Sequence, residues 1–369
     1  MKKLLSAVLS VVLTFTFALS LCSCKSKNES IKYEGNYENN LKNTVLNVFN
    51  WGEYISDGSE GSIDINKAFT KLTGIEINYT TYENNESMYS KLKSGGVSYD
   101  IIIPSDYMIE RLANEDMLKK VDVSKLSNYK YIDKKYKNLF FDKNNEYSVP
   151  YSVGMVGLIY NSQKVTEKPD SWKIMWDEKY KNNVLTFNNP RDAFAIPQFL
   201  LGYDLNSTNR AEWDKAADLL ISQKKNLQSY VMDEIFQKME DGEAAIAPYY
   251  AGDYLLMKEN NPDLEFVYPK EGTNIFVDSV CIPKNCQNYE AALLYMNFLM
   301  EPEIALQTAE YVKYATPNTA VMANDKYSLK GNEYLYPAED KYPKVQYFHD
   351  IDSETRSYYE KLWEKVKLS

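Results

Sequence analysis

Short apolar segments alternate with amphipathic ones in the first third of this chain, and this alternation limits the possible folds more than any other feature. Residues 45–50, 75–82 and 99–103 have the continuous or alternating apolar pattern of buried strands. Residues 63–72 and 85–92 have the apolar spacing of helices, and a glycine follows each of them closely. Alternation of this kind predicts parallel β-α-β units and therefore an α/β fold.

The rest of the chain is predicted to form a second set of elements. A chain of 369 residues is long enough for about two domains. The segments 147–159 and 276–283 are predicted to be extended and to cross between two lobes. We expect one lobe from residues 44–151 and 278–315 and the other from 152–277 and 316–369. Within them, strands are predicted at 184–187 and 244–247, and helices at 107–114, 171–180, 213–224, 236–242, 289–300, 302–312 and 353–367.

The N-terminus is similar to the signal of a bacterial lipoprotein. Lys2 and Lys3 precede an uncharged apolar run from Leu4 to Leu21, and Cys24 follows with Leu21 at −3 and a serine at −1. This similarity implies a signal peptide at residues 1–23, cleavage before Cys24, and acylation of its sulfur. The alternative is an uncleaved transmembrane anchor, because the apolar run is nearly long enough to span a bilayer.

Residues 24–43 are polar and without apolar periodicity, which predicts a flexible tether. Folding is expected to begin near Thr44. An acylated Cys24 would hold the protein on the outer face of a membrane, so the predicted location is extracytoplasmic and lipid-anchored, or at the periplasmic face.

Charge and cysteine content limit the possible partners. The net charge of −10 argues against nucleic acid, whose phosphates attract basic surfaces, and is compatible with cationic ligands. After the predicted signal peptide and Cys24, the remaining cysteines are Cys281 and Cys286. These two could form a local disulfide or remain as buried free thiols, and the sequence leaves both open.

Aromatic residues stand beside carboxylates at several predicted strand ends. Aromatic faces and carboxylates both attract an organic ammonium ion. Open α/β sheets place their ligands at strand ends, so these pairs are expected to converge on a cationic small molecule. The pairs are Trp51-Gly52-Glu53-Tyr54, Ser105-Asp106-Tyr107, Arg191-Asp192-Ala193-Phe194 and Phe276-Val277-Asp278.

Signals of catalysis are weak. His349 is the single histidine and lies far from any nucleophile motif, and the sequence has no phosphate-binding glycine loop, dinucleotide fingerprint or calcium-loop spacing. We therefore expect no enzyme activity, no cofactor and no metal. Glycoside hydrolysis by a carboxylate pair stays open as an alternative, with Glu53, Asp106, Asp192 and Asp278 as its candidates.

Seven ordered motifs resemble one known family. From about Thr44 to the C-terminus, the chain resembles the spermidine/putrescine-binding proteins of bacterial ABC importers. This resemblance implies the type II periplasmic-binding-protein fold, in which two α/β lobes joined by two crossover segments close on a polyamine in the cleft between them. It also implies an ABC permease as partner and a monomeric protein. The motifs are residues 50–54, 79–92, 99–107, 147–151, 268–272, 278–279 and 314–318.

The resemblance also assigns ligand-binding roles. From the first lobe, it places in the cleft two aromatic residues of the first loop and the Ser-x-Tyr of the second loop. The second lobe adds one aromatic residue and one acid. The hinge adds an acid, and a tyrosine late in the chain is the last contact. These are Trp51, Tyr54, Ser105, Tyr107, Tyr250, Asp192, Asp278 and Tyr314.

Several positions depart from the family pattern. Gly52 replaces a hydroxyl residue, Asn189 replaces an aspartate of a spermidine-binding member, and Phe276 and Tyr250 replace tryptophans. Glu53 and Asp106 could restore the missing charge, although Asp106 could instead cap a helix.

Two further questions are left open by the sequence. Family members contact the ligand through a glutamine late in the chain, and this glutamine has no secure counterpart between Gln346 and Asp350. A binding protein of the same fold for another cation, such as a quaternary amine or an amino sugar, is the alternative to a polyamine.

Overall fold

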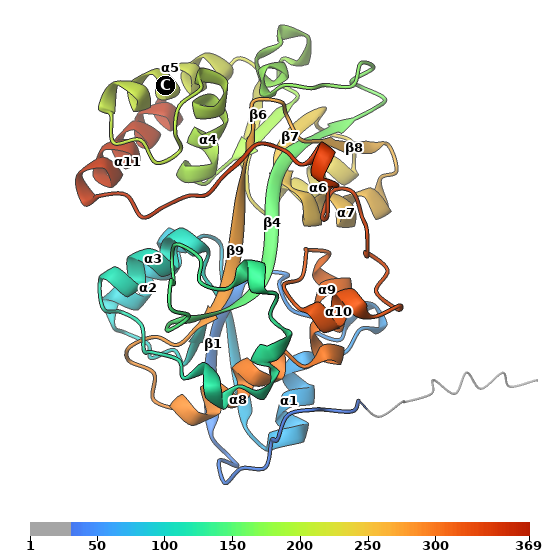
Figure 1. Cartoon of the computed structure of the whole chain (residues 1–369). Helices are drawn as coiled ribbons and strands as arrows, with labels where there is room; N and C mark the ends of the chain where they lie inside the picture. The colour runs from blue at the N-terminus through green and yellow to red at the C-terminus, as the bar shows by residue number, and fades with distance from the viewer. Residues whose placement is uncertain (1–30) are drawn as a thin grey trace, which may run out of the picture. The chain divides into compact units, whose positions relative to one another are not determined.

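Two long antiparallel strands run through the middle of the structure and carry the other strands at their ends (Figure 1). They are β4 (Ser148–Asn161) and β9 (Thr273–Cys281), paired from Ser148–Cys281 to Met155–Ile275 with a register shift between Pro150 and Ser152. The sheet order is β2 (Glu76–Tyr82), β1 (Val45–Trp51), β3 (Ile101–Ile102), β9, β4, β7 (Ile246–Tyr250), β5 (Val184–Phe187) and β6 (Leu227–Val231). The computed structural model describes residues 31–369, and Tyr33–Ser369 form one compact unit.

The first half of this unit, at the bottom of Figure 1, contains the β-α-β units predicted from the alternating pattern. Strand β1 (Val45–Trp51) lies between β2 (Glu76–Tyr82) and β3 (Ile101–Ile102), and both neighbours are parallel to it. Strand β3 meets β9 through Ile102 and Cys281. The helices that follow these strands are α1 (Ile65–Thr73), α2 (Asn85–Ser94) and α3 (Asp106–Asn114).

The ends of the first two helices follow from the local sequence. The side chains of Asp64 and Asn84 accept hydrogen bonds from the amides of Lys67 and Ser87, which satisfies donors at each helix start. Gly74 ends α1 in the left-handed conformation, where glycine has no steric penalty.

The second half lies at the top of Figure 1. Strands β5 and β6 are parallel, β5 also pairs with β7, and β7 and β8 pair antiparallel with β4. The strands are β5 (Val184–Phe187), β6 (Leu227–Val231), β7 (Ile246–Tyr250) and β8 (Leu264–Val267). The helices are α4 (Pro190–Leu201), α5 (Arg210–Gln223), α6 (Ile235–Glu240) and α7 (Ala251–Asn260).

The last third of the chain contributes to both halves. Helices α8 (Tyr289–Leu299) and α9 (Pro302–Val312) lie in the first half, and the short α10 (Thr319–Ala323) packs against α9. The two-residue β10 (Val345–Gln346) pairs with β9, and α11 (Ser353–Leu368) packs against α5 in the second half. The predicted lobe bounds remain a prediction. Short 3-10 helices occupy Ser59–Gly61, Val123–Lys125, Ser127–Tyr131, Lys134–Tyr136, Trp172–Trp176, Glu178–Tyr180 and Glu339–Lys341.

Some elements differ from the prediction. The helix predicted at 171–180 is two 3-10 turns, because Asp177 ends the first turn and its side chain caps the second by accepting from the Lys179 amide. Helix α4 was not predicted, because Pro190 and Pro197 suggest a break in the chain. Pro190 occupies the first helical turn, where its missing N–H costs nothing.

The packed part of the chain includes residues before Thr44, within the range 24–43 that is predicted to be a flexible tether. Tyr37 is 6% exposed, and its hydroxyl donates to Glu301 Oε1 at 2.7 Å. The amides of Glu34 and Gly35 donate to the two oxygens of the same carboxylate at 2.9 and 2.7 Å. Asn128 Nδ2 is a further donor at 2.8 Å, so one buried carboxylate holds this segment to α9.

Several other predictions concern the ends of the chain and its cysteines. The signal peptide at 1–23, the acylated Cys24 and the first residues of the tether lie outside the described residues. No helix between residues 31 and 369 is long and apolar enough to cross a membrane. Cys281 and Cys286, for which the sequence allowed a disulfide, are both free and buried.

The Glu301 contacts predict a stabilising role for the segment at 34–37. In Glu301→Gln, one acceptor oxygen becomes an amide donor that faces buried donors, so the free energy of unfolding should fall by about 2–3 kcal/mol. Urea denaturation of the full chain measures this change. Glu303→Gln, in the first turn of α9 and only partly buried, is the matched control and should differ from wild type by less than about 0.5 kcal/mol. Equal stability of both variants would show that the segment is not held by Glu301.

Candidate ligand-binding cleft

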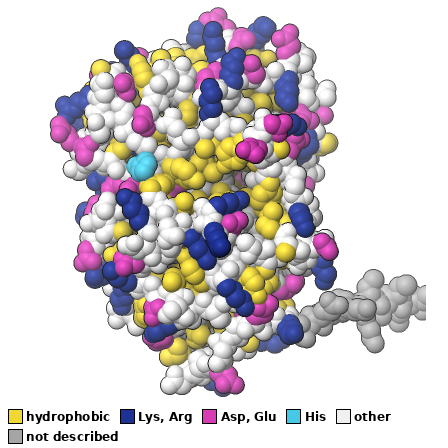
Figure 2. Space-filling view, viewed as in Figure 1, with side chains coloured by type: hydrophobic (Ala, Val, Ile, Leu, Met, Phe, Trp, Pro, Cys, Tyr) yellow, Lys and Arg dark blue, Asp and Glu magenta, His cyan; other side chains and the backbone are white. Residues whose placement is uncertain are grey.

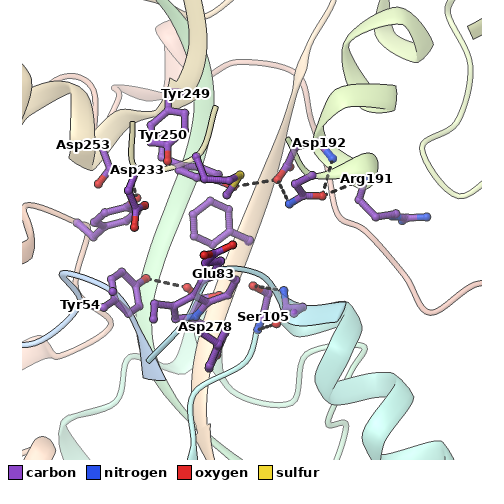
Figure 3. A pocket seen from close by; sticks show the side chains of 18 of the residues that line it. Tyr54, Glu83, Ser105, Arg191, Asp192, Asp233, Tyr249, Tyr250, Asp253 and Asp278 are labelled. Carbon is purple, nitrogen blue, oxygen red and sulfur yellow. Dashed lines mark hydrogen bonds between the residues drawn. The ribbon is translucent and has the colours of Figure 1, made fainter. Parts of the chain in front are cut away.

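Strand ends and helix starts from both halves line one pocket of about 880 Å³, part of it open to solvent (Figure 3). Figure 2 shows hydrophobic side chains gathered in a band across the middle of one face of the molecule, between regions where charged side chains are more frequent. All twelve predicted ligand-binding residues line this one pocket. They are Trp51, Glu53, Tyr54, Ser105, Asp106, Tyr107, Asn189, Asp192, Tyr250, Phe276, Asp278 and Tyr314.

The end of β1 supplies two aromatic residues whose positions are fixed by hydrogen bonds. Trp51 Nε1 donates to the carbonyl oxygen of Ile103 at 2.8 Å, and the indole packs on Tyr82 with the ring centroids 4.7 Å apart. The Tyr54 hydroxyl donates to Asp278 Oδ2 at 2.7 Å. Both rings are therefore held at the pocket wall before any ligand arrives.

Asp278 on β9 is a buried carboxylate that faces the cleft. It is 3% exposed, and among the described residues its Oδ1 has no hydrogen-bond partner. Burial raises the pKa of Asp278 to about 6, although the nearby hydroxyls of Ser105 and Tyr54 oppose this shift. A carboxylate oxygen that is removed from water and left without a donor favours a cationic donor from a ligand.

The start of α3 brings Ser105, Asp106 and Tyr107 to the cleft. Asp106 is fully buried; its Oδ1 accepts from the Tyr107 amide at 2.7 Å and its Oδ2 from the Val277 amide at 3.1 Å. Asp106 therefore joins the start of α3 to β9. Ser105 Oγ accepts from Asn85 Nδ2 at 3.1 Å.

The start of α4 supplies the acid of the second half. Asp192 Oδ2 accepts from Asn189 Nδ2 at 2.7 Å and from the Tyr250 hydroxyl at 2.8 Å. Asn189 also caps α4 by accepting from the amides of Arg191 and Asp192. Burial raises the pKa of Asp192 to about 7, although the Tyr250 hydrogen bond opposes this shift.

Two glycines leave space for the rings that line the centre of the pocket. A Cβ on Gly154 would lie 2.2 Å from the Phe276 ring, and a Cβ on Gly252 would lie 2.4 Å from the Tyr314 ring. Tyr250 meets Phe276 edge to face, with centroids 5.4 Å apart. The rings of Phe276 and Tyr314 thus pack directly on glycine backbone, and any larger residue at these two glycine positions would displace them.

Some residues of the pocket were missed by the sequence analysis. Asp253 Oδ2 accepts from the Tyr314 hydroxyl at 3.0 Å, and burial raises its pKa to about 7. The sequence Tyr250-Ala251-Gly252-Asp253 is another aromatic–carboxylate pair at a strand end, so the same signal could have found it. The others missed are Tyr82, Glu83, Asn85, Arg191, Met232, Asp233, Phe236, Tyr249, Asn274 and Phe348.

The outer part of the pocket is acidic on both sides. Glu53 is exposed and has a positive φ of 50°, and Glu83 is exposed as well. Asp233 approaches from the second half, with its Oδ2 3.3 Å from the position of a Cβ on Gly52. Burial, followed by the charges of Glu234 and Glu83, raises the pKa of Asp233. Because Gly52 has no side chain, the Asp233 carboxylate has room beside it.

The late segment, whose alignment was open, contributes Phe348 to the pocket. Gln346 does not line the pocket, because its Oε1 accepts from the Leu205 amide at 3.1 Å. His349 lies 3.4 Å from Glu110, measured from Nδ1 to Oε2, and its ring packs on Phe140.

Comparisons with known proteins agree with this fold and this pocket. The profile of the bacterial extracellular solute-binding protein family matches residues 64–333. The spermidine/putrescine-binding periplasmic protein of Salmonella typhimurium is 34% identical over 327 residues, which cover 88% of this chain and 92% of the relative. Its counterpart in Escherichia coli K12 is 33% identical with the same coverage.

Solved structures give the same result. One from Listeria monocytogenes is 36% identical, covers 88% of this chain and 99% of the other, and superposes with a TM-score of 0.83. The spermidine/putrescine ABC transporter substrate-binding protein of Streptococcus pneumoniae is 34% identical, with the same coverage and a TM-score of 0.74.

The fold and the cleft define a solute-binding protein of the periplasmic type: two α/β halves on a shared pair of strands, with a pocket where their strand ends meet. The chain belongs to the bacterial extracellular solute-binding protein family.

The buried carboxylates predict how the stability of the ligand-free protein depends on pH. The pKa values of Asp278, Asp192 and Asp253 are about 6, 7 and 7, against 3.8 as their ordinary value. Between these values the folded state binds more protons than the unfolded state, so the free energy of unfolding should fall as pH rises from about 4 to 7, by up to about 1.4 kcal/mol per pH unit for each of the three groups.

Urea denaturation at a series of pH values measures this slope. The variant Asp192→Asn/Asp278→Asn removes two of the three titrating groups and should flatten the curve. Parallel curves for wild type and variant would contradict the assignment of the slope to these carboxylates.

Proposed function

We propose that this protein captures a linear polyamine, spermidine or putrescine, between its two halves and delivers it to the permease of an ABC importer. The names of the relatives at 33–36% identity support this proposal. The single observation that carries it is Asp278, a buried carboxylate that faces the pocket with one oxygen unpartnered among the described residues. An alkylammonium group supplies the missing donor and the missing charge together.

The rest of the pocket suits the remainder of such a ligand. Aromatic faces at Trp51, Tyr250, Phe276 and Tyr314 can pack against methylene segments and attract the charged ends. Asp192 and Asp253 then offer carboxylates to further ammonium groups, and Asn189 orients the first of them. Alternating rings and carboxylates match a chain in which methylene segments alternate with charged nitrogens.

Ligand capture is proposed to couple to closure. The ligand touches residues of both halves, so it stabilises the arrangement in which the two walls face each other. In this proposal β4 and β9 carry the hinge between the predicted lobes, and the closed form docks on the permease. An acylated Cys24 would keep the protein, as a monomer, on the outer face of the membrane.

The family membership favours binding over hydrolysis. Asp106 is engaged with two backbone amides and Asp192 with Asn189 and Tyr250, so neither stands as a free acid of a glycosidase pair. We propose that the protein performs no chemistry on its ligand and needs no cofactor. Calorimetric titration of the full chain with putrescine, spermidine and spermine tests the proposal, and no saturable heat with any of the three would end it.

Loss of the Asp278 carboxylate should weaken polyamine binding strongly. Asp278→Ala leaves the ligand ammonium without its buried partner, which should cost about 2–5 kcal/mol of binding free energy. Titration by the quenching of tryptophan fluorescence measures the change. Asp325→Asn, at a fully exposed aspartate, is the matched control and should bind like wild type. Unchanged affinity in Asp278→Ala would remove Asp278 from the binding site.

Polyamine affinity should also depend on pH. Binding of a cation favours the ionised form of Asp192, Asp253 and Asp278, whose pKa values of about 6 to 7 make them partly protonated below neutral pH. Affinity should therefore fall as pH is lowered from 8 to 5, and binding at pH 6 should release protons. Calorimetry in two buffers of different ionisation enthalpy detects this release, and equal heats in both buffers would contradict it.

A further inference from the structure

Two oppositely charged side chains from different halves lie near Tyr107 with unpaired atoms. Glu86 is at the start of α2, which packs against β2 in the first half. Arg191 is in the first turn of α4, which packs against β5 in the second half. Figure 1 shows α2 in the lower half of the molecule and α4 in the upper half. The mechanism of ligand binding described above uses neither charge.

Glu86 holds Tyr107 with one oxygen and leaves the other unused. The Tyr107 hydroxyl donates to Glu86 Oε1 at 2.9 Å, whereas Glu86 Oε2 is buried and has no hydrogen-bond partner among the described residues. Burial raises the pKa of Glu86, and the Tyr107 hydrogen bond and the charge of Arg191 oppose this shift. The Glu86 carboxylate is thus positioned behind a residue of the pocket wall.

Arg191 is 2% exposed, and its guanidinium is surrounded by aromatic rings. Its Cζ lies 4.4 Å from the centroid of Phe348, 5.6 Å from that of Tyr107 and 5.9 Å from that of Tyr359. Nη2 donates to Asn206 Oδ1 at 3.1 Å and to the carbonyl oxygen of His349 at 3.5 Å. Nε and Nη1 have no partner among the described residues, so two buried donors are left over.

Buried donors and acceptors without partners lower the stability of the folded protein, and a buried charge without a partner lowers it further. Both effects disappear if the free donors of Arg191 meet the free oxygen of Glu86. Tyr107 meets Glu86 through its hydroxyl and Arg191 through its ring, so an approach of the two halves would bring the two charges together beside a residue of the pocket.

We propose that Glu86 and Arg191 form an ion pair between the two halves when the protein closes, and that this pair positions Tyr107 and slows ligand release. Glu86 and Arg191 act as positioning residues, since neither needs to touch the ligand. The statement about release rests on the proposed function, whereas the pairing between the halves does not.

A double-mutant cycle on the full chain, purified in detergent, tests the proposal. Spermidine dissociation rates are compared for wild type, Glu86→Gln, Arg191→Met and the double variant by stopped-flow fluorescence. Each single variant should release the ligand about tenfold faster with an almost unchanged association rate, and the double variant should be no faster than about the worse single variant. The proposal would be overturned if the two substitutions had additive effects on the free energy of activation for dissociation, or if the single variants released spermidine at the wild-type rate.

The chain offers a matched control pair. Arg111 and Glu115 also form a partly buried pair beside a tyrosine, Tyr89, but both belong to the first half. Arg111→Met and Glu115→Gln should leave the dissociation rate unchanged even if they reduce stability. Arg191→Lys keeps the charge and should recover part of the slow release, which loss of packing alone would not explain.

Hydrogen exchange of the ligand-free protein separates this proposal from the proposed function. In this proposal the ligand-free protein already populates the closed state, in which the pair couples the two halves. Glu86→Gln should therefore raise amide exchange at the start of α4, and Arg191→Met should raise it at the start of α2. Exchange that rises only in the helix that carries each substitution would overturn the pairing. Absence of polyamine binding by wild type would overturn the proposed function alone, and the exchange result would still decide the pairing.

Discussion

The antiparallel pairing of β4 with β9 is the constraint on which the rest of the structure depends. These two strands are shared by both halves, and each half adds its own strands to one end of the pair. Asp278 lies on β9 where the ladder with β4 passes a register shift, opposite Ser152. The ladder thus fixes the position of the buried carboxylate, and both walls of the cleft are attached through the same two strands.

The cleft stores electrostatic free energy in its empty form. Three carboxylates are removed from water without a cation, and tyrosine hydroxyls supply only part of the hydrogen bonding that water would give. A multiply charged amine compensates these costs in one step, because its nitrogens bring both donors and positive charge. Selectivity for a cationic chain then follows from burial, since a neutral ligand of equal size leaves the carboxylates uncompensated.

Much of the first half and of the cleft could be predicted from the sequence. Glycine stops and apolar periodicity placed α1 and α2 closely, and aromatic–carboxylate pairs at strand ends identified residues that line one pocket. Helix α4 could not be predicted because Pro190 carries the same signal in a loop as at a helix start, and because Pro197 lies inside the helix, where proline is disfavoured. Asp233 and Phe348 were missed because long-range packing, not a local pattern, brings them to the cleft.

Gly154 and Gly252 suggest how the binding preference of such a protein could diverge. Each lies beneath an aromatic ring, so one added methyl group at either position would push that ring toward the ligand. Substitutions behind the rings can therefore reduce the volume available to the ligand in steps of one carbon, while every carboxylate stays in place. A lineage could change the length or thickness of its preferred solute in this way without losing its attraction for positive charge.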